Sequence, residues 1–435
     1  MKIAVVGTGV AGLVAAHRLH PRHEITVFEA DDRIGGHVNT VDVELDGRHH
    51  AVDTGFIVYN ERNYPGFVAL LAEFDVATQP TAMSFGVSDA ASGIEFRASN
   101  LNALFAQRRN LVKPSFLRLL TDIVRFNRAA RSLIADEPPW TSTGRLVGNG
   151  RASDTTGDET LAQFVRRGRY SDAFVHQFLI PFGASIWSAD PATFTEFPIR
   201  SYARFMHNHG LLEVTGQPQW RTITGGSARY VEALIASFAT RIRVASPVNK
   251  IVRRIDDRAG VSVEVLSEHG SETFDRVVIA THSDQALRLL GDPTPDEHAV
   301  LGAIGYQRNV ATLHTDESML PTNPRARASW NYAVERGSHR STVTYWMNQL
   351  QSIESTRPLL VTLNRRNAIA DNQVLANFEY DHPVFDGPAI AAQRRRHEIQ
   401  GERGVFFAGA YWGYGFHEDG VQSAHEVVAA IEGAP

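Results

Sequence analysis

The feature that most constrains this chain is a glycine-rich turn close to its start. It stands between an apolar stretch at 2–6 and a helical pattern at 11–19, and it reads Gly7-Thr8-Gly9-Val10-Ala11-Gly12. Gly7 permits the tight bend, Gly9 lets the backbone approach a pyrophosphate, and Gly12 lets strand and helix pack closely. The N–H groups of the first helical turn, from Val10 and Ala11 onward, favour a phosphate at the positive end of the helix dipole.

A second strand pattern at 24–28 ends at Glu29, about 20 residues beyond the turn. An acidic side chain at that place hydrogen-bonds a ribose hydroxyl in dinucleotide-binding proteins. We therefore predict a bound dinucleotide, with Glu29 and the adjacent Ala30 at its ribose. An ordinary glycine turn is the alternative, and it would not require strand, helix, strand and acid in this register.

The composition excludes some classes of protein and some kinds of site, but it does not identify a binding partner. The 435 residues are 43% hydrophobic and 21% charged with a net charge of -5, which is typical of a globular protein. The chain has no Cys, which excludes disulfides, Cys-ligated metals, thiol catalysis and flavin attachment through sulfur. We see neither a signal-peptide pattern nor about 20 consecutive apolar residues, so we expect a cytoplasmic protein that meets a membrane only at its inner face.

The secondary-structure signals change along the chain. Strands and helices alternate over 2–60, helices are predicted over 60–130, and a Pro-, Gly-, Ser- and Thr-rich loop follows at 137–158. Strand patterns return from 220 and alternate like antiparallel strands over 300–380. The chain closes with a strand at 405–408, a glycine-aromatic loop and a helix at 421–431.

This order predicts an α/β fold with two interleaved domains. A Rossmann-type dinucleotide domain is assembled from residues 1–60, 220–295 and 400–435. An α+β substrate domain, with a helical part and an antiparallel sheet, takes residues 61–219 and 296–399.

The opening motif continues into a second glycine pair: Glu29-Ala30-Asp31-Asp32-Arg33-Ile34-Gly35-Gly36-His37. This resembles the signature of the flavin amine oxidase superfamily, in which an acid is followed by Arg-x-Gly-Gly-Arg. Monoamine oxidases, phytoene desaturases, protoporphyrinogen oxidases and UDP-galactopyranose mutases share it. The resemblance implies a GR2-like domain that binds FAD rather than NAD, with Gly35, Gly36 and His37 at the cofactor.

Further blocks match the superfamily in the expected order. They are Asp53-Thr54-Gly55, Thr224-Gly225-Gly226-Ser227, Val248, the strand at 275–280, and Phe406-Phe407-Ala408-Gly409 with Gly420-Val421. The resemblance places the first block beside the flavin, Val248 at the adenine and the last block at the pyrophosphate and isoalloxazine. The additional cofactor contacts that it implies are Thr54, Gly55, Val248, Gly409, Ala410, Asp419, Gly420 and Val421.

Three rarer strings suggest a narrower resemblance: 313–316, 344–351 and Gly409-Ala410-Tyr411-Trp412-Gly413-Tyr414-Gly415-Phe416-His417-Glu418-Asp419-Gly420. They look like bacterial predicted FAD/NAD-binding oxidoreductases associated with cyclopropane-fatty-acyl synthase-type lipid methyltransferases. That resemblance implies a desaturase or dehydrogenase acting on a modified fatty acyl chain. It also implies a lipid methyltransferase as partner.

The chain departs from the superfamily pattern at three positions. His37 replaces an Arg, which changes one phosphate contact, and Ala410 replaces an acid near the ribityl chain. Asn309 or a neighbour stands where amine oxidases commonly place a Lys near the flavin N5. The last departure disfavours amine oxidation.

The closing loop supplies the candidate catalytic residues. Tyr411 and Trp412 would line the flavin face and an apolar substrate channel, and a packed domain interface is the alternative. His417 is a candidate general base or flavin hydrogen-bond donor, with a structural hydrogen bond as the alternative. We expect Asp419 to cap the helix at 421–431, and His314 and His382 to be structural.

Residues 108–131 carry seven basic side chains against one acid, Asp122, with apolar residues at helical spacing. Such a helix is able to lie on an anionic bilayer, and a solvated basic face of the domain is the alternative. We find no metal-ligand spacing and no nucleic-acid recognition module, so we expect neither a metal nor a nucleic-acid partner.

Together these observations predict an FAD-dependent oxidoreductase that removes hydride from an apolar, lipid-like substrate. Three alternatives remain open: an amine oxidase, a non-redox flavin-dependent mutase or isomerase, and a non-catalytic flavoprotein partner of a lipid methyltransferase.

Overall fold

The computed structural model describes the whole chain except residues 136–158, 214–215, 257–259, 336, 338 and 434–435. The predicted loop at 137–158 therefore lies outside the described residues. No helix among the described residues is both long enough and apolar enough to span a bilayer.

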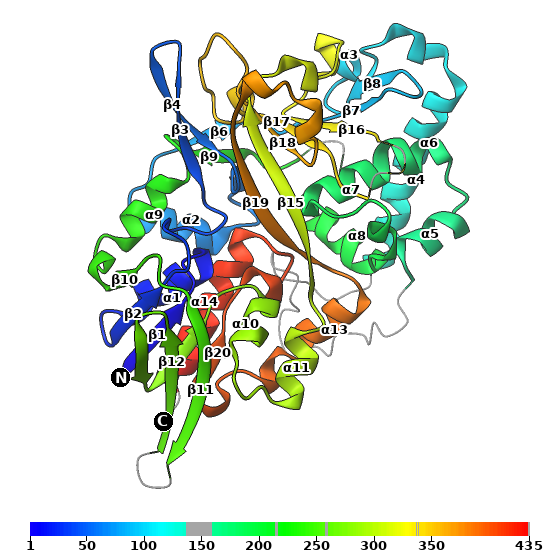
Figure 1. Cartoon of the computed structure of the whole chain (residues 1–435). Coiled ribbons are helices and arrows are strands. Elements are labelled where there is room, and N and C mark those ends of the chain that lie inside the picture. Colours follow the sequence, from blue (N-terminus) through cyan, green and yellow to red (C-terminus); the bar gives the residue numbers. More distant parts are fainter. Residues whose placement is uncertain (136–158, 214–215, 257–259, 336, 338, 434–435) are drawn as a thin grey trace.

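A five-stranded parallel sheet contains the first strand of the chain and lies near the N-terminus in Figure 1. Its order is β10-β2-β1-β14-β20, formed by Ile242–Arg243, Glu24–Phe28, Lys2–Val6, Arg276–Ile279 and Val405–Phe407. The central strand β1 pairs with β2, which follows it closely, and with β14, which comes from a distant part of the chain. Strands from three separate stretches of sequence thus share one sheet.

Both faces of this sheet are covered, as a parallel sheet requires. Ile3 and Val5 of β1 pack on α1 (Val10–Leu19), and Ala4 and Val6 face a second core on the opposite side. The alternation follows from the two-residue period of a strand. The first core also contains residues of α2 (Pro65–Glu73), α9 (Ala228–Ile235) and α14 (His417–Gly433). The second contains residues of β11 (Val248–Asp256), β12 (Gly260–Ser267), β13 (Gly270–Phe274), α10 (Ser283–Leu289), α11 (Pro295–Leu301) and α13 (Gly387–Arg394).

A mixed seven-stranded sheet forms the other part of the molecule, in the order β19-β15-β18-β17-β16-β7-β8. Its strands are Val374–Val384, Gly305–His314, Leu360–Leu363, Val343–Trp346, Trp330–Ala333, Phe85–Asp89 and Ile94–Arg97. The long antiparallel ribbon of β15 and β19 runs from this sheet toward the parallel sheet (Figure 1). The α/β fold class predicted from the sequence is confirmed.

The helical prediction for 60–130 is wrong in part, because this segment contains β6 (Thr78–Thr81), β7 and β8. Strand β6 pairs with β9 (Trp220–Ile223), and β7 pairs with β16, which lies far later in the chain. Strands β6 and β7 have these distant partners, which local periodicity does not reveal, whereas β8 pairs only with the adjacent β7 in a hairpin. Smaller pairings among the described residues are the hairpin of β3 (Thr40–Leu45) and β4 (Arg48–Asp53), β5 (Tyr59–Asn60) against β9, and the antiparallel sheet β11-β12-β13.

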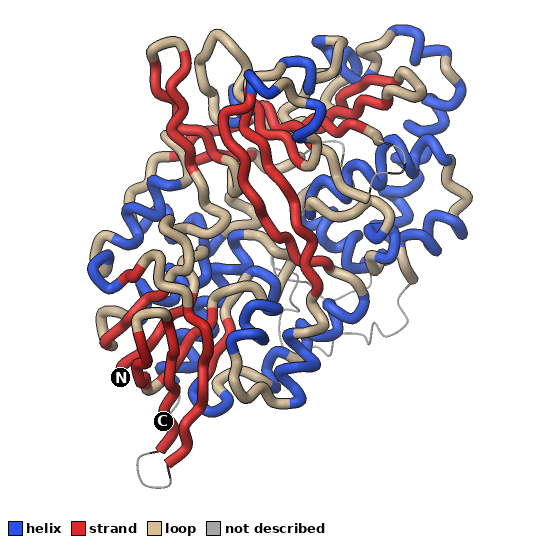
Figure 2. Tube along the Cα trace, viewed as in Figure 1, coloured by secondary structure: helices blue, strands red, loops and turns tan. Residues whose placement is uncertain are grey.

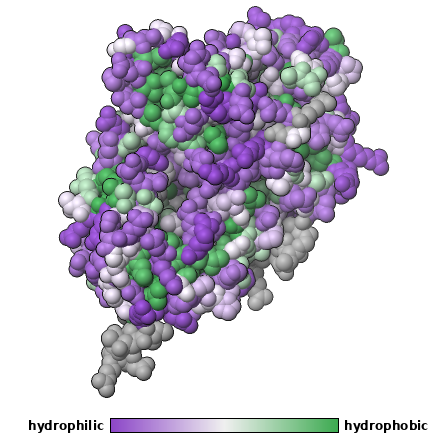
Figure 3. Space-filling model, viewed as in Figure 1, coloured by the Kyte–Doolittle hydropathy of each residue, from purple (hydrophilic) through white to green (hydrophobic). Residues whose placement is uncertain are grey.

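A helical part packs beside the large sheet, as Figure 2 shows. It contains α4 (Pro114–Ile134), α5 (Leu161–Arg167), α6 (Asp172–Phe174), α7 (Ile180–Trp187) and α8 (Ile199–Asn208), around an aromatic core. The short helices α3 (Leu101–Leu104) and α12 (Met347–Leu350) lie outside this helical part. The face of the molecule in Figure 3 is mostly hydrophilic, with smaller hydrophobic areas between.

Candidate flavin site

The glycines of the opening turn are required by its geometry. Gly7 has a φ of 103°, and a Cβ built on it would lie 2.9 Å from the carbonyl oxygen of Ala280. A Cβ on Gly12 would lie 2.0 Å from the carbonyl oxygen of Gly7. Any side chain at Gly12 would therefore displace strand β1 from helix α1.

Gly9 differs, because a Cβ built on it would meet no heavy atom within 4 Å. It is the N-cap of α1 and provides no side-chain hydrogen bond to the first turn. The N–H groups of Val10, Ala11 and Gly12 precede the first backbone bond of the helix, which Leu13 donates to Gly9. Open space beside uncapped N–H groups fits a pyrophosphate.

The second glycine pair packs directly on the turn. Gly35 and Gly36 have φ values of 123° and 58°, and a Cβ on Gly36 would lie 3.1 Å from the Cα of Gly9. The N–H of Gly35 donates to the Thr8 hydroxyl at 3.2 Å. Both glycine motifs, which the sequence linked by resemblance alone, are thus brought together.

Glu29 braces the same turn. Its carboxylate accepts hydrogen bonds from the N–H of Thr8 at 2.9 Å, from the Thr8 hydroxyl, and from the N–H of Asp31 at 3.0 Å. Its backbone oxygen accepts from Ser246, which places the segment leading to Val248 beside the end of β2. Ala30 is exposed next to it. The contact of Glu29 with a ribose remains a prediction, since a carboxylate can accept further bonds.

Asp53 holds two of the resembling blocks together, a role that the sequence did not reveal. Its buried carboxylate accepts from the N–H and hydroxyl of Ser227, from Thr40 and from Gln351. Burial raises the pKa of Asp53 to about 6, against the lowering effect of the bonds from Thr40 and Ser227. The carboxylate therefore fixes the turn at Gly225-Gly226-Ser227 against β4.

Thr54 and Gly55 follow Asp53 and contact the base of the β15–β19 ribbon. The Thr54 hydroxyl lies 2.9 Å from the Tyr380 hydroxyl, and a Cβ on Gly55 would lie 2.0 Å from the carbonyl oxygen of His37. Backbone thus passes closely beside His37, and the placement of this segment at the flavin remains a prediction.

His37 belongs to a cluster of rings between the two parts of the molecule. Its ring centroid lies 5.1 Å from that of Tyr380, 5.4 Å from His382 and 5.8 Å from His282. Burial and the neighbouring His382 and His282 hold the pKa of His37 well below its usual range. A neutral imidazole therefore stands at the position for which the resemblance implies an arginine.

Asn309 reaches the same cluster from β15. Its amide nitrogen lies 2.9 Å from Nδ1 of His382, and its oxygen accepts from Asn364 at 2.8 Å. The side chain is fully buried. Asn309 is thus a neutral amide hydrogen-bonded to neutral partners, because burial lowers the pKa of His382 to about 4. That Asn309 or a neighbour takes the place of the amine oxidase lysine remains a prediction from the resemblance.

The closing block returns to the opening turn. A Cβ on Gly420 would lie 2.6 Å from Cγ1 of Val10, so the start of α14 abuts the start of α1. The N–H of Gly409 donates to the Ser423 hydroxyl at 3.0 Å, and Val421 is fully buried in the first core. Ala410 is half-buried at the edge of this block.

The aromatic loop divides between two cores. Tyr411 and Trp412 are buried in the second core of the parallel sheet, with ring centroids 4.7 Å apart. Phe416 stacks on Phe205 of the helical part at 5.3 Å, and the Trp187 indole donates to the backbone oxygen of Tyr414. These contacts favour a packed interface for Tyr411 and Trp412, so their catalytic role remains a prediction.

His417 is packed rather than accessible. Its ring stacks on Phe56 at 3.5 Å, and Nε2 lies 3.1 Å from the Tyr230 hydroxyl. Burial lowers its pKa to about 3, so the imidazole is neutral. The geometry favours the structural hydrogen bond over an acid–base role.

Asp419 occupies a different position in the helix from the one predicted. Helix α14 begins at His417, four residues before the predicted start, so Asp419 stands in its first turn. Its carboxylate reaches back to accept from the N–H of Phe416 at 2.8 Å and of Tyr414 at 3.1 Å, in the manner of an acid at the third helical position. Its other oxygen is buried without a partner.

Glu418 has a role that the sequence did not indicate. Its carboxylate accepts from the N–H of Gly66 at 3.0 Å and of Phe67 at 2.9 Å, which are the first N–H groups of α2. It thereby caps a helix from the opposite end of the chain. Only this tertiary contact distinguishes it from a surface acid.

Among the described residues, no group of three or more His, Cys, Asp or Glu side chains is arranged to hold a metal ion. The site therefore consists of a backbone anion cradle at Gly7–Gly12, the ring cluster around His37 and Asn309, and the closing block.

Known proteins resemble this chain over most of its length. The family model for flavin containing amine oxidoreductase matches residues 10–356. A putative flavin-containing monoamine oxidase, AofH of Mycobacterium tuberculosis, is 28% identical over 311 residues, which are 69% of this chain and 61% of the relative. The chain thus spans about three-fifths of that relative's length.

Solved structures share the fold. Cyclohexylamine oxidase from Brevibacterium oxydans superposes with a TM-score of 0.69 at 17% identity, covering 99% of this chain and 98% of that one. A CLA-producing fatty acid isomerase from P. acnes superposes with a TM-score of 0.66 at 15% identity, covering 98% of each chain. At these identities the likeness concerns the fold alone.

Proposed function

Because this chain belongs to the flavin-containing amine oxidoreductase family, we propose that it uses FAD to remove hydride from an apolar, fatty-acyl-type substrate. FAD is the cofactor typical of this family, and the cradle at Gly7–Gly12 fits its pyrophosphate. When bound, FAD accepts the hydride and passes the electrons to an acceptor such as O₂.

The buried amide of Asn309 is the observation that carries the choice of substrate. A lysine at this place would present a positive charge at the reacting centre, whereas Asn309 is held by Asn364 and by His382. Neutral, hydrogen-bonded groups suit a substrate without charge, since an unpaired ion in such surroundings is costly. This chain's contribution is therefore to orient an apolar chain and exclude water.

Aromatic side chains support the same proposal. Tyr414 and Phe416 pack against Phe205, with ring centroids 5.3 Å apart in both pairs. They continue the closing block into the helical part, where aromatic rings dominate the core. An acyl chain that approaches the flavin from this side would meet aromatic rather than charged side chains.

Anaerobic mixing of the FAD-loaded protein with candidate substrates tests this function. We expect a detergent-solubilised fatty acyl lipid to bleach the flavin absorbance, and primary amines of similar chain length to leave it unchanged. Bleaching by amines but by no acyl lipid would overturn the proposal.

Amine oxidation is the second candidate, and the similarity to AofH favours it. The amine arm of the same experiment tests it directly. A third outcome, in which pre-reduced protein converts an acyl lipid without net oxidation, would instead indicate an isomerase.

A further inference from the structure

One short segment of the chain, residues 101–128, combines exposed apolar side chains with positive charge. Eight large hydrophobic residues are exposed among the described residues, and five of them fall in a single short segment of the chain. These five are Leu101, Leu111, Val112, Leu117 and Val124. Val112 is 80% exposed and Leu101 75%, which is unusual for side chains of this size.

The five residues lie on three successive elements. Leu101 begins α3, Leu111 and Val112 end the 3-10 helix at Arg108–Val112, and the other two are on α4. Leu117 and Val124 are seven residues apart, so they share one face of α4. Phe116, Leu119 and Phe126 are buried on the opposite side against the neighbouring helices and sheet. The exposed stripe is thus the outer face of a well-anchored helix.

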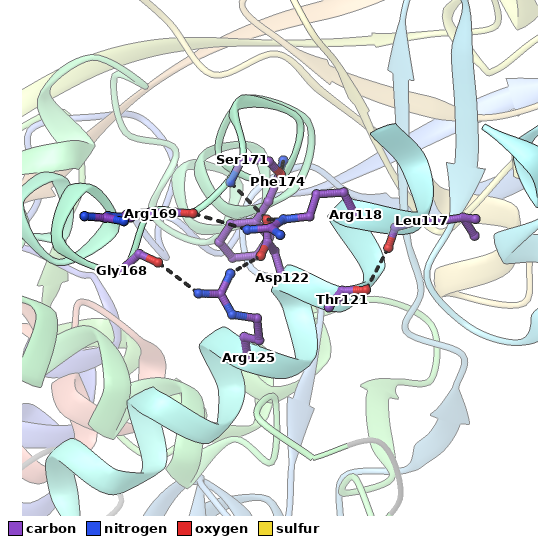
Figure 4. Close-up of polar contacts among 9 residues, drawn as sticks. All are labelled: Leu117, Arg118, Thr121, Asp122, Arg125, Gly168, Arg169, Ser171 and Phe174. Carbon is purple, nitrogen blue, oxygen red and sulfur yellow. Dashed lines mark hydrogen bonds and ion pairs between the residues drawn. The ribbon is translucent and has the colours of Figure 1, made fainter. Parts of the chain in front are cut away.

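Asp122 shows how the segment keeps its positive charge. It is the only acid between residues 101 and 131, and it is fully buried. Arg118 and Arg125 bind its carboxylate, and the N–H of Ser171 donates to it at 2.9 Å (Figure 4). In the same view Leu117 points away from this cluster. The acid therefore anchors α4 from within and presents no negative charge outside.

Exposed basic residues lie between and beside the exposed apolar ones in the sequence. Arg108, Arg109, Arg118 and Arg128 are exposed, and Lys113 adjoins Val112 directly. We propose that this surface, formed by residues 101–128, docks on an anionic lipid bilayer. Its leucines and valines enter the interface while its arginines and Lys113 meet lipid phosphates.

The positive charge beside the exposed apolar side chains favours an anionic bilayer as the binding partner. Exposed apolar side chains on a helical face insert between lipid headgroups, and each nearby basic residue adds about five-fold in affinity for anionic membranes. The inference concerns binding alone, so it holds or fails independently of the proposed reaction. It would nevertheless bring the enzyme to the phase in which acyl lipids reside.

Co-sedimentation of the full chain with vesicles tests the proposal. We expect binding to vesicles of phosphatidylcholine and phosphatidylglycerol mixed seven to three, and more than about 25-fold weaker binding to pure phosphatidylcholine, which removes the attraction of all the basic side chains. The double variant Lys113→Gln/Arg128→Gln leaves the Asp122 pairs intact and should weaken binding about 25-fold, which is five-fold for each charge. Leu111→Ser/Val112→Ser should weaken it at least about ten-fold.

A matched control uses exposed apolar residues elsewhere. Val244 and Leu375 are 41% and 42% exposed outside this surface, so Val244→Ser/Leu375→Ser should bind like the unaltered protein. Failure of the unaltered protein to sediment with anionic vesicles would overturn the proposal. So would equal losses in the control and the surface variants. Because co-sedimentation measures membrane binding and not flavin absorbance, neither result bears on flavin reduction.

Discussion

The opening turn and the closing block both border the candidate flavin site, yet they are built in different ways. At Gly7–Gly12 the backbone itself forms the cradle, which depends on the glycines having no side chains. At Gly409–Gly420 side chains hold the structure together. Glu418 and Asp419 accept hydrogen bonds from backbone N–H groups, and His417 packs inside a core. A site formed by the backbone can be recognised from consecutive residue types in the sequence. A site formed by side chains depends on hydrogen-bond and packing partners from distant parts of the chain.

The largest effect should come from crowding the opening turn. In Gly12→Ala the new Cβ would lie 2.0 Å from the carbonyl oxygen of Gly7, so α1 and β1 must separate. We expect a loss of at least about 4 kcal/mol in the free energy of unfolding and loss of FAD retention. Urea unfolding and the flavin-to-protein absorbance ratio after purification measure both.

Gly9→Ala provides the matched control for that prediction. The added Cβ meets nothing in the protein, so the unfolding free energy should stay within about 0.5 kcal/mol. Only FAD affinity should fall, by about ten-fold or more, if this space receives the pyrophosphate. Unchanged FAD affinity in Gly9→Ala would contradict the assigned cradle.

In the closing block, the largest expected effect belongs to Glu418. Glu418→Ala removes the acceptor for two buried N–H groups of α2, which should cost about 3 kcal/mol. Glu418→Gln keeps one acceptor oxygen and should cost about half as much. Equal, small losses in both variants, measured by urea unfolding, would show that the cap contributes little.

His417 should make the closing block sensitive to acid. Its pKa is lowered from 6.5 to about 3 in the folded protein, so folding favours the neutral ring. This contribution is complete above pH 6.5 and is lost as the pH falls toward 3, by about 2 kcal/mol at pH 5. Between pH 7.5 and 5.0 the unaltered protein should therefore lose about 2 kcal/mol more unfolding free energy than His417→Gln. A variant with the same pH dependence as the unaltered protein would refute this.

Within the closing block, the smallest effect is expected at Asp419. Burial and the nearby Glu418 hold the pKa of Asp419 well above its ordinary value, against the hydrogen bonds from Phe416 and Tyr414. Asp419→Asn retains an acceptor oxygen for both N–H groups and avoids the cost of burying a carboxylate charge. Its unfolding free energy at pH 7 should stay within about 1 kcal/mol of the original. A loss of about 3 kcal/mol or more would mean that the ionised form is needed.

The same contrast explains how far the sequence could lead. Glycine spacing, strand length and the acid at Glu29 are local, so the cofactor class and the α/β fold were predicted and are confirmed. The bond from Asp53 to Ser227, the cap that Glu418 places on α2, and the pairing of β7 with β16 all join distant parts of the chain. No single-sequence pattern specifies such pairs, because each partner is an ordinary polar or β-forming residue on its own.

The position of β1 in the middle of its sheet has a consequence for the newly made chain. Val5 pairs with Val27 on one side and with Val278 on the other. At about 5–20 residues per second, the ribosome adds the second neighbour some tens of seconds after the first. During that interval the first βαβ unit has an open, apolar strand edge, which is a template for unwanted pairing. A chaperone that shields this edge would thus affect the yield of folded protein more than its final stability.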